Sequence, residues 1–75
     1  MVELVRFIAR SLVDTPEAVE VREIEEQDAV VIELRVAPDD MGKVIGKQGR
    51  IAKAIRSIVK AATLKNAKPV FVEIL

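Results

Sequence analysis

The stretch that decides the fold is residues 42–51, which read Gly-Lys-Val-Ile-Gly-Lys-Gln-Gly-Arg-Ile. It holds all three glycines of a 75-residue chain. Glycine is the residue that most readily adopts backbone angles closed to other residues, so a sharp change of direction is expected here. We predict a Gly-x-x-Gly turn from Gly46 to Gly49 that joins two helices.

The helix after the turn is predicted to start at about Arg50, because apolar residues recur from there at helical spacing, and this periodicity fails near Leu64. Its expected buried stripe consists of Ile51, Ala54, Ile55, Ile58, Val59 and Ala62, and its exposed side of Arg50, Lys53, Arg56 and Lys60. The helix before the turn is predicted to be short, from Pro38-Asp39-Asp40 to about Ile45, with Asp39 as its N-cap.

The flanking segments complete an α-β-β-α-α-β order. An amphipathic helix is predicted over residues 2–13 and ends at the proline at position 16. Alternating apolar residues predict strands at 19–24 and 30–36, joined as a hairpin by a polar turn, and a last strand at 70–74. This order favours an α+β fold in which a three-stranded sheet has its helices packed on one face, and residues 1–75 form a single domain.

The composition removes most enzyme classes. The chain has no cysteine and no histidine, so it offers no thiol nucleophile, no imidazole base, no structural zinc site and no disulfide framework. The adjacent carboxylates Asp39 and Asp40 are better suited to capping a helix than to acid-base chemistry. We therefore expect no catalytic residue, no metal and no cofactor. No targeting segment and no membrane span are expected, which is compatible with the cytoplasm.

Charge is divided along the chain although the formal net charge is zero. Residues 1–40 hold four basic and eleven acidic side chains, whereas residues 41–75 hold eight basic side chains and only one acid, Glu73. Basic residues at helical spacing are often no more than a solvated helix face. Beside a glycine turn, however, they also indicate a surface that attracts a polyanion.

Two common phosphate-binding motifs do not fit the glycine cluster. A P-loop needs four residues between its glycines and a hydroxyl residue after the lysine, but here three intervene and Gln48 stands in the hydroxyl position. A dinucleotide fingerprint needs Gly-x-Gly-x-x-Gly after a strand, which is also absent. What remains is a turn whose bare backbone a sugar-phosphate chain can approach, with helix amides behind it and the charge of Lys47 at its tip.

The stretch Val44-Ile45-Gly46-Lys47-Gln48-Gly49-Arg50-Ile51 resembles the signature of a KH domain, and the element order resembles the type II, prokaryotic arrangement. The resemblance covers the whole chain and is greatest to the small single-domain bacterial KhpA proteins. One position departs from the broad pattern, which has a larger aliphatic residue three places after the second glycine, where this chain has Ala52.

This resemblance implies single-stranded RNA binding by an RNA chaperone or post-transcriptional regulator, with a link to cell shape and cell-wall homeostasis. It also implies dimers, either a homodimer or a heterodimer with a larger KH protein of the Jag/KhpB type. A KH groove clamps about four nucleotides, with the glycine loop on the backbone and an apolar floor beneath the bases. The RNA-binding residues expected here are Val44, Ile45, Gly46, Lys47, Gln48, Gly49, Arg50 and Lys53.

Several assignments stay open. Val36, Val44 and Ile45 are candidates for the apolar floor, but they equally fit the core. Arg56 and Lys60 supply either long-range attraction or only solubility, and Phe71 is a candidate partner contact. The alternative function for the whole chain is a protein-interaction module that mainly dimerises, with the glycine loop as part of the contact.

Overall fold

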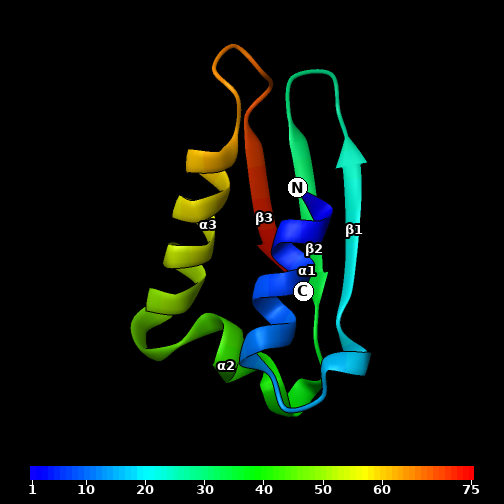
Figure 1. The fold of residues 1–75 in the computed structure, drawn as a ribbon, viewed down its shortest axis with the longest axis vertical. Coiled ribbons are helices and arrows are strands. Elements are labelled where there is room, and N and C mark those ends of the chain that lie inside the picture. The colour runs from blue at the N-terminus through cyan, green and yellow to red at the C-terminus, as the bar shows by residue number, and fades with distance from the viewer.

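The computed structural model describes residues 1–75 (Figure 1). Its helices and strands are α1 (Val2–Leu12), β1 (Glu20–Glu25), β2 (Val30–Arg35), α2 (Met41–Ile45), α3 (Arg50–Ala62) and β3 (Val70–Ile74). Short 3-10 turns occupy Pro16–Ala18, Pro38–Asp40 and Lys47–Gly49. The predicted α+β order is confirmed, and the main departure is that the residues before α2 form a separate 3-10 turn.

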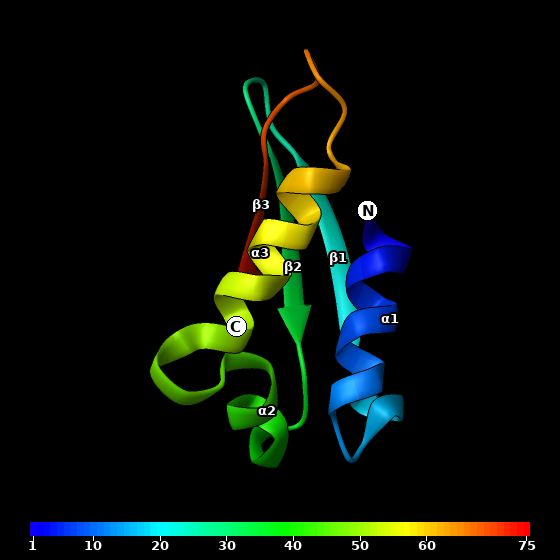
Figure 2. The ribbon, with the colours of Figure 1, turned by 60° about the vertical axis from the view of Figure 1, so that its left-hand side comes forward.

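The three strands form one sheet in the order β1-β2-β3. β1 and β2 are an antiparallel hairpin, whereas β2 and β3 run parallel. A parallel pair needs a crossover connection, which α2, the glycine loop and α3 provide. Figures 1 and 2 show the helices gathered on one face of the sheet, as predicted, so the opposite face is left bare.

The core lies between this sheet and the helices. Strand alternation buries Ile32 and Leu34 of β2 on the helix side, while Glu33 between them points to the bare face. Buried residues from every other main element except β1 complete the core: Val5 and Ala9 of α1, Val44 of α2, Ile55 and Val59 of α3, and Val72 of β3. None of the helices is both long enough and apolar enough to cross a membrane.

The buried side of α3 differs from the predicted stripe. Ala52, Ile55 and Val59 are buried, whereas Ala54, Ile58 and Ala62 are exposed, and Ile58 keeps 45% of its surface. The helix starts directly after Gly49, and that start fixes which side faces the sheet. Ala52 is buried because it lies on the side of α3 that faces the sheet: Ala52, Ile55 and Val59 are spaced i, i+3 and i+7, which places them on one side of the helix.

Candidate nucleic-acid interface

The Gly46–Gly49 loop is a sharp corner with an exposed tip. The loop places Lys47 and Gln48 at the surface. Gln48 adopts left-handed angles (φ 59°, ψ 24°), while Lys47 before it keeps helical ones. Within the loop, the Gly46 N–H donates to the Gly42 carbonyl at 2.8 Å and the Gly49 N–H donates to the Gly46 carbonyl at 3.1 Å, which closes the turn. The loop therefore presents the Lys47 ammonium and the Gln48 side-chain amide at the surface.

The two loop glycines are required for different reasons. Gly46 has φ +76° and ψ 172°, a conformation almost closed to other residues, and an added Cβ would lie 2.6 Å from Ile51 Cγ1. Gly49 also has a positive φ, +72°, but an added Cβ there would meet nothing within 4 Å. Gly46 is therefore needed by the fold itself, whereas Gly49 leaves bare backbone facing open space.

Cations follow the loop along one side of α3. Arg50, Lys53, Arg56 and Lys60 are spaced by three, three and four residues, which keeps them near one another on the helix. Arg50 Nη2 donates to Gln48 Oε1 at 3.2 Å and so lies over the loop tip. All four side chains are exposed, and none pairs with a carboxylate.

Two of the eight basic residues of the C-terminal half are neutralised within the fold. Lys43 Nζ lies 3.0 Å from Asp14 Oδ2 and 3.5 Å from Asp40 Oδ1. Lys68 Nζ lies 2.9 Å from Glu25 Oε2 and donates to the Glu26 carbonyl. These three ion pairs fasten loops to the scaffold. Five of the six remaining basic residues lie on the loop tip and α3, and the sixth is Lys65, between α3 and β3.

Asp40 anchors α2 to the end of α1. It is buried, and its carboxylate accepts hydrogen bonds from the amides of Asp14 (3.2 Å) and Thr15 (3.0 Å). Burial raises the pKa of the Asp40 carboxyl, but these amides and Lys43 outweigh it and hold the pKa below its usual value. The expected N-cap at Asp39 is wrong, since α2 begins after Asp40 and has no side-chain cap.

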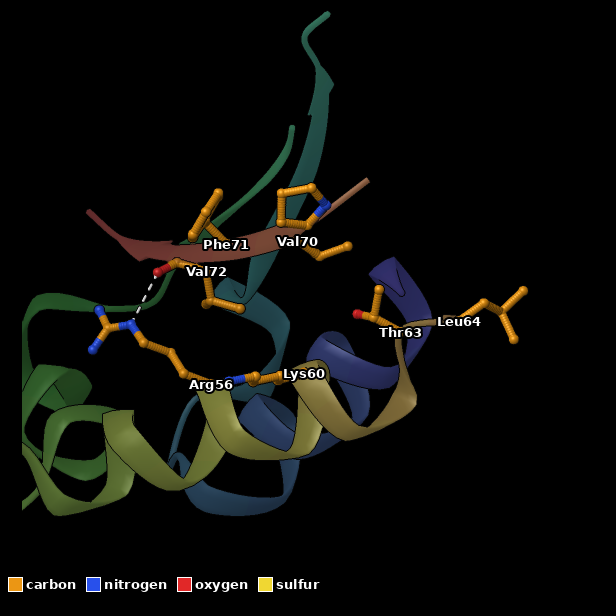
Figure 3. A pocket seen from close by; sticks show the side chains of 8 residues that line it. Arg56, Lys60, Thr63, Leu64, Val70, Phe71 and Val72 are labelled. Atoms are coloured by element: carbon orange, nitrogen blue, oxygen red, sulfur yellow. Dashed lines mark hydrogen bonds between the residues drawn. The ribbon is translucent and has the colours of Figure 1, made fainter. Parts of the chain in front are cut away.

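A groove of about 560 Å³ runs between α3 and β3 (Figure 3). It is lined by Arg56, Lys60, Thr63 and Leu64 on one side and by Pro69, Val70, Phe71 and Val72 on the other. Arg56 Nε donates to the Val72 carbonyl at 3.2 Å, on the edge of β3 that has no strand beside it. In Figure 3 the Val72 side chain points toward α3, while Phe71 points the other way.

The structure separates the predicted site residues into two groups. Gly46, Lys47, Gln48, Gly49, Arg50 and Lys53 lie together on the loop and the start of α3, and Ile45 is half-buried beside them. Val44 has no exposed surface and Val36 has 6%, so of the two places left open for them both residues lie in the core, and Val44 offers no surface to RNA.

The sequence analysis did not single out the apolar residues Leu64, Pro69 and Val70, which line the groove. Arg56 and Lys60, which the sequence left as distant charges or solubilising residues, also lie on this groove. A usable signal was the short connection between the predicted last helix and last strand, residues 63–69, which makes these two elements neighbours.

Comparisons with known proteins agree with this architecture. A family model described as the KhpA/KhpB KH domain matches residues 2–74. The RNA-binding protein KhpA of Caldanaerobacter subterraneus subsp. tengcongensis is 65% identical over 75 residues, which cover 100% of both chains. The RNA-binding protein KhpA of Clostridium perfringens is 61% identical over the same full length.

Among solved structures, the crystal structure of Era in complex with MgGDPNP and nucleotides 1506–1542 of 16S ribosomal RNA aligns with a TM-score of 0.61 and 25% identity. That alignment covers 97% of this chain and 28% of the Era chain. With the full-length match to the family model and to close relatives, this chain belongs to the KhpA/KhpB family of KH-domain proteins.

Proposed function

We propose that this chain binds single-stranded RNA through the Gly46–Gly49 loop and the groove between α3 and β3. The observation that carries the proposal is the open space in front of Gly49, at a corner where the Lys47 and Gln48 side chains are exposed. A missing Cβ lets the sugar-phosphate chain approach the main chain closely, and the Lys47 ammonium supplies a positive charge for a phosphate. The names of the close relatives, RNA-binding protein KhpA, support the same function.

The basic side chains on α3 mark the surface along which the RNA phosphates bind. From Lys47 at the loop tip, the charged side of α3 leads through Arg50 and Lys53 to the groove. No acid lies between positions 41 and 72, so the phosphate chain meets no repulsive side chain of this segment. Binding that depends on a few phosphate contacts is of modest strength and falls as salt is added.

The groove supplies the contacts for bases. Val70, Pro69 and Leu64 offer apolar surface, and the free edge of β3 offers main-chain groups that no neighbouring strand uses. An unpaired base fits such a surface, because its ring packs on apolar groups while its edge bonds to the main chain. A duplex hides its base edges, so single strands are the expected ligand.

The test is a double substitution at the loop tip, Lys47→Asp with Gln48→Asp, measured by fluorescence anisotropy with a labelled single-stranded RNA. Both side chains are exposed, so the fold should survive while RNA affinity falls by at least about tenfold. A matched control is Arg10→Asp with Ser11→Asp, which makes the same change in charge at exposed positions of α1. Equal affinity of the loop variant and the wild type would remove the loop from the proposed site.

The family supports finer proposals about the biological setting. We infer that residues 1–75 act as a single KH domain in the cytoplasm, without catalysis, as an RNA chaperone or post-transcriptional regulator. A role in cell shape and cell-wall homeostasis, and pairing with a second copy or a KhpB-type protein, follow from the family resemblance. The family description, which includes both KhpA and KhpB, supports the pairing.

A further inference from the structure

The groove between α3 and β3 extends around the free edge of β3. Four consecutive residues, from Pro69 to Val72, take part in its lining. Neighbouring residues of a strand point to opposite faces of the sheet, so this lining comes from both faces. Val72 belongs to the core on the helix side, whereas Phe71 points away from α3 toward the bare face (Figure 3). The groove therefore reaches from the helix side of the sheet to the beginning of its bare face.

Phe71 offers an aromatic ring just beyond this edge. The residue keeps 57% of its surface, and it has a neighbouring strand on one side only, where Val31 of β2 lies opposite it. An accessible aromatic ring is a surface on which a nucleobase of any kind can stack. The ring thus adds a base-binding surface at the point where the groove leaves the helix side.

Arg56 places a cation at the edge that separates the groove from Phe71. Its Nε donates to the Val72 carbonyl at 3.2 Å, which holds the guanidinium beside the edge of β3. Its two Nη groups have no partner in the protein, and a guanidinium can donate through such groups to phosphate oxygens. A phosphate that crosses the edge here meets a positive charge, because Arg56 covers the carbonyl oxygen that would otherwise repel it.

We propose that the bound RNA strand crosses the free edge of β3 and stacks one further base on Phe71, with Arg56 holding the phosphate at the crossing. This inference rests on the proposed RNA binding and extends that site from the groove to the bare face of the sheet. Glu73 sets the limit of the extension. It lies two residues beyond Phe71 on the same face, is exposed and has no basic partner, so its carboxylate repels a second phosphate.

The position of Phe71, and not its exposure alone, assigns it this role. Single exposed apolar residues are common on protein surfaces. The other phenylalanine of the chain, Phe7, keeps 71% of its surface, but it lies on α1 in a hollow that shares no lining residue with the groove. Phe7 is therefore a matched control, with an equally accessible ring away from the proposed path of the RNA.

The chain has no tryptophan and no tyrosine, so a tryptophan placed at either phenylalanine is a lone fluorescent reporter. Phe71→Trp and Phe7→Trp are each titrated with a labelled, unstructured RNA of about eight nucleotides, roughly twice the length that a KH groove clamps. Anisotropy of the label reports binding in the same samples. We expect a base stacked on the ring to quench the emission of Phe71→Trp in parallel with the anisotropy change, while the emission of Phe7→Trp stays constant.

Affinities of leucine variants give a second readout. Phe71→Leu keeps an apolar side chain but removes the ring, so the affinity for the same RNA should fall about fivefold or more. Phe71→Trp should bind at least as tightly as the wild type, because the larger ring stacks as well, and Phe7→Leu should bind like the wild type. Thermal unfolding verifies that each variant is folded, and the tryptophan readout decides even where Phe71→Leu loses stability.

The outcomes separate this inference from the function on which it rests. Constant emission of Phe71→Trp while the anisotropy reports bound RNA, or an unchanged affinity of folded Phe71→Leu, would overturn the stacking site and leave RNA binding at the loop intact. Emission of Phe71→Trp that responds to protein concentration and not to RNA would assign the ring to a protein contact and would also overturn it. Absence of RNA binding by the wild type would overturn the proposed function and this inference with it.

Discussion

Replacing the three glycines one at a time by alanine should separate the stability of the fold from the binding of RNA. Gly46→Ala places a Cβ 2.6 Å from Ile51 Cγ1 and 2.9 Å from Ile51 Cβ, an atom fixed to its own backbone. The backbone conformation at Gly46 costs an alanine about 1–3 kcal/mol, and the overpacking costs about 1–3 kcal/mol more. A chain of this length has a free energy of unfolding of roughly 4–11 kcal/mol, so this variant should be largely destabilised.

Gly49→Ala should have the opposite effect, lowering the affinity for RNA while leaving the chain folded. Its left-handed conformation costs an alanine about 1–2 kcal/mol, but the new methyl group meets no protein atom within 4 Å. The chain should therefore stay folded, while the methyl group occupies the space that we assign to the RNA backbone and lowers affinity at least about tenfold. Gly42→Ala is the control, because its Cβ also meets nothing and alanine favours the helix by about 0.5–1 kcal/mol.

For all three variants, urea unfolding measures the free energy of unfolding, and titration with RNA followed by fluorescence anisotropy measures the affinity for RNA. The expected order of stability is Gly42→Ala, wild type, Gly49→Ala and last Gly46→Ala. The reasoning is refuted if Gly46→Ala is as stable as the wild type, or if folded Gly49→Ala binds RNA with unchanged affinity.

Three further predictions follow from the loop and its anchor. Gln48→Gly should raise the free energy of unfolding by about 0.5–1 kcal/mol in urea titrations, because a non-glycine residue at φ 59° is strained; lower stability would contradict this. The ionised Asp40 carboxylate, whose pKa is lowered from 3.8, should contribute stability that is present above that pH and lost as pH falls through its folded pKa. Asp40→Asn should therefore show a smaller loss of stability between pH 5 and 3 than the wild type in urea unfolding at each pH, and an equal loss would exclude Asp40 as a source. If about three phosphates are bound, the slope of log K for RNA against log salt should be about −2, and a slope near zero would exclude phosphate contacts.

Much of the fold could be predicted because the decisive signals are local. Alternation around Ile32 and Leu34 marks a strand with one buried face, and the spacing of Gly46 and Gly49 marks the corner between two helices. The loop cations were also predictable, because Lys47, Arg50 and Lys53 follow the corner at helical spacing.

The remaining features depend on contacts between distant parts of the chain. The apolar residues of α3 would allow the helix to turn either of two sides toward the sheet. Only packing on the sheet decides that Ala52 is buried and Ile58 is exposed. Asp40 pairs with amides 25 and 26 residues earlier, a contact without any periodic signal in the sequence. The groove also needs β3 at the edge of the sheet, and although the short connection 63–69 places β3 beside α3, the strand order shows that β3 is an edge strand.

The central claim is that bare backbone at the glycine corner, beside a cationic helix, holds a single RNA strand. An NMR titration of the ¹⁵N-labelled chain with an unstructured RNA oligonucleotide tests it most directly, because each amide reports its own surroundings. We predict the largest shift changes at the amides of Gly46 to Arg50, with smaller ones along α3 and at Val70 to Val72. Changes confined to the face of the sheet that bears no helix, with the loop amides unmoved at saturation, would contradict the claim.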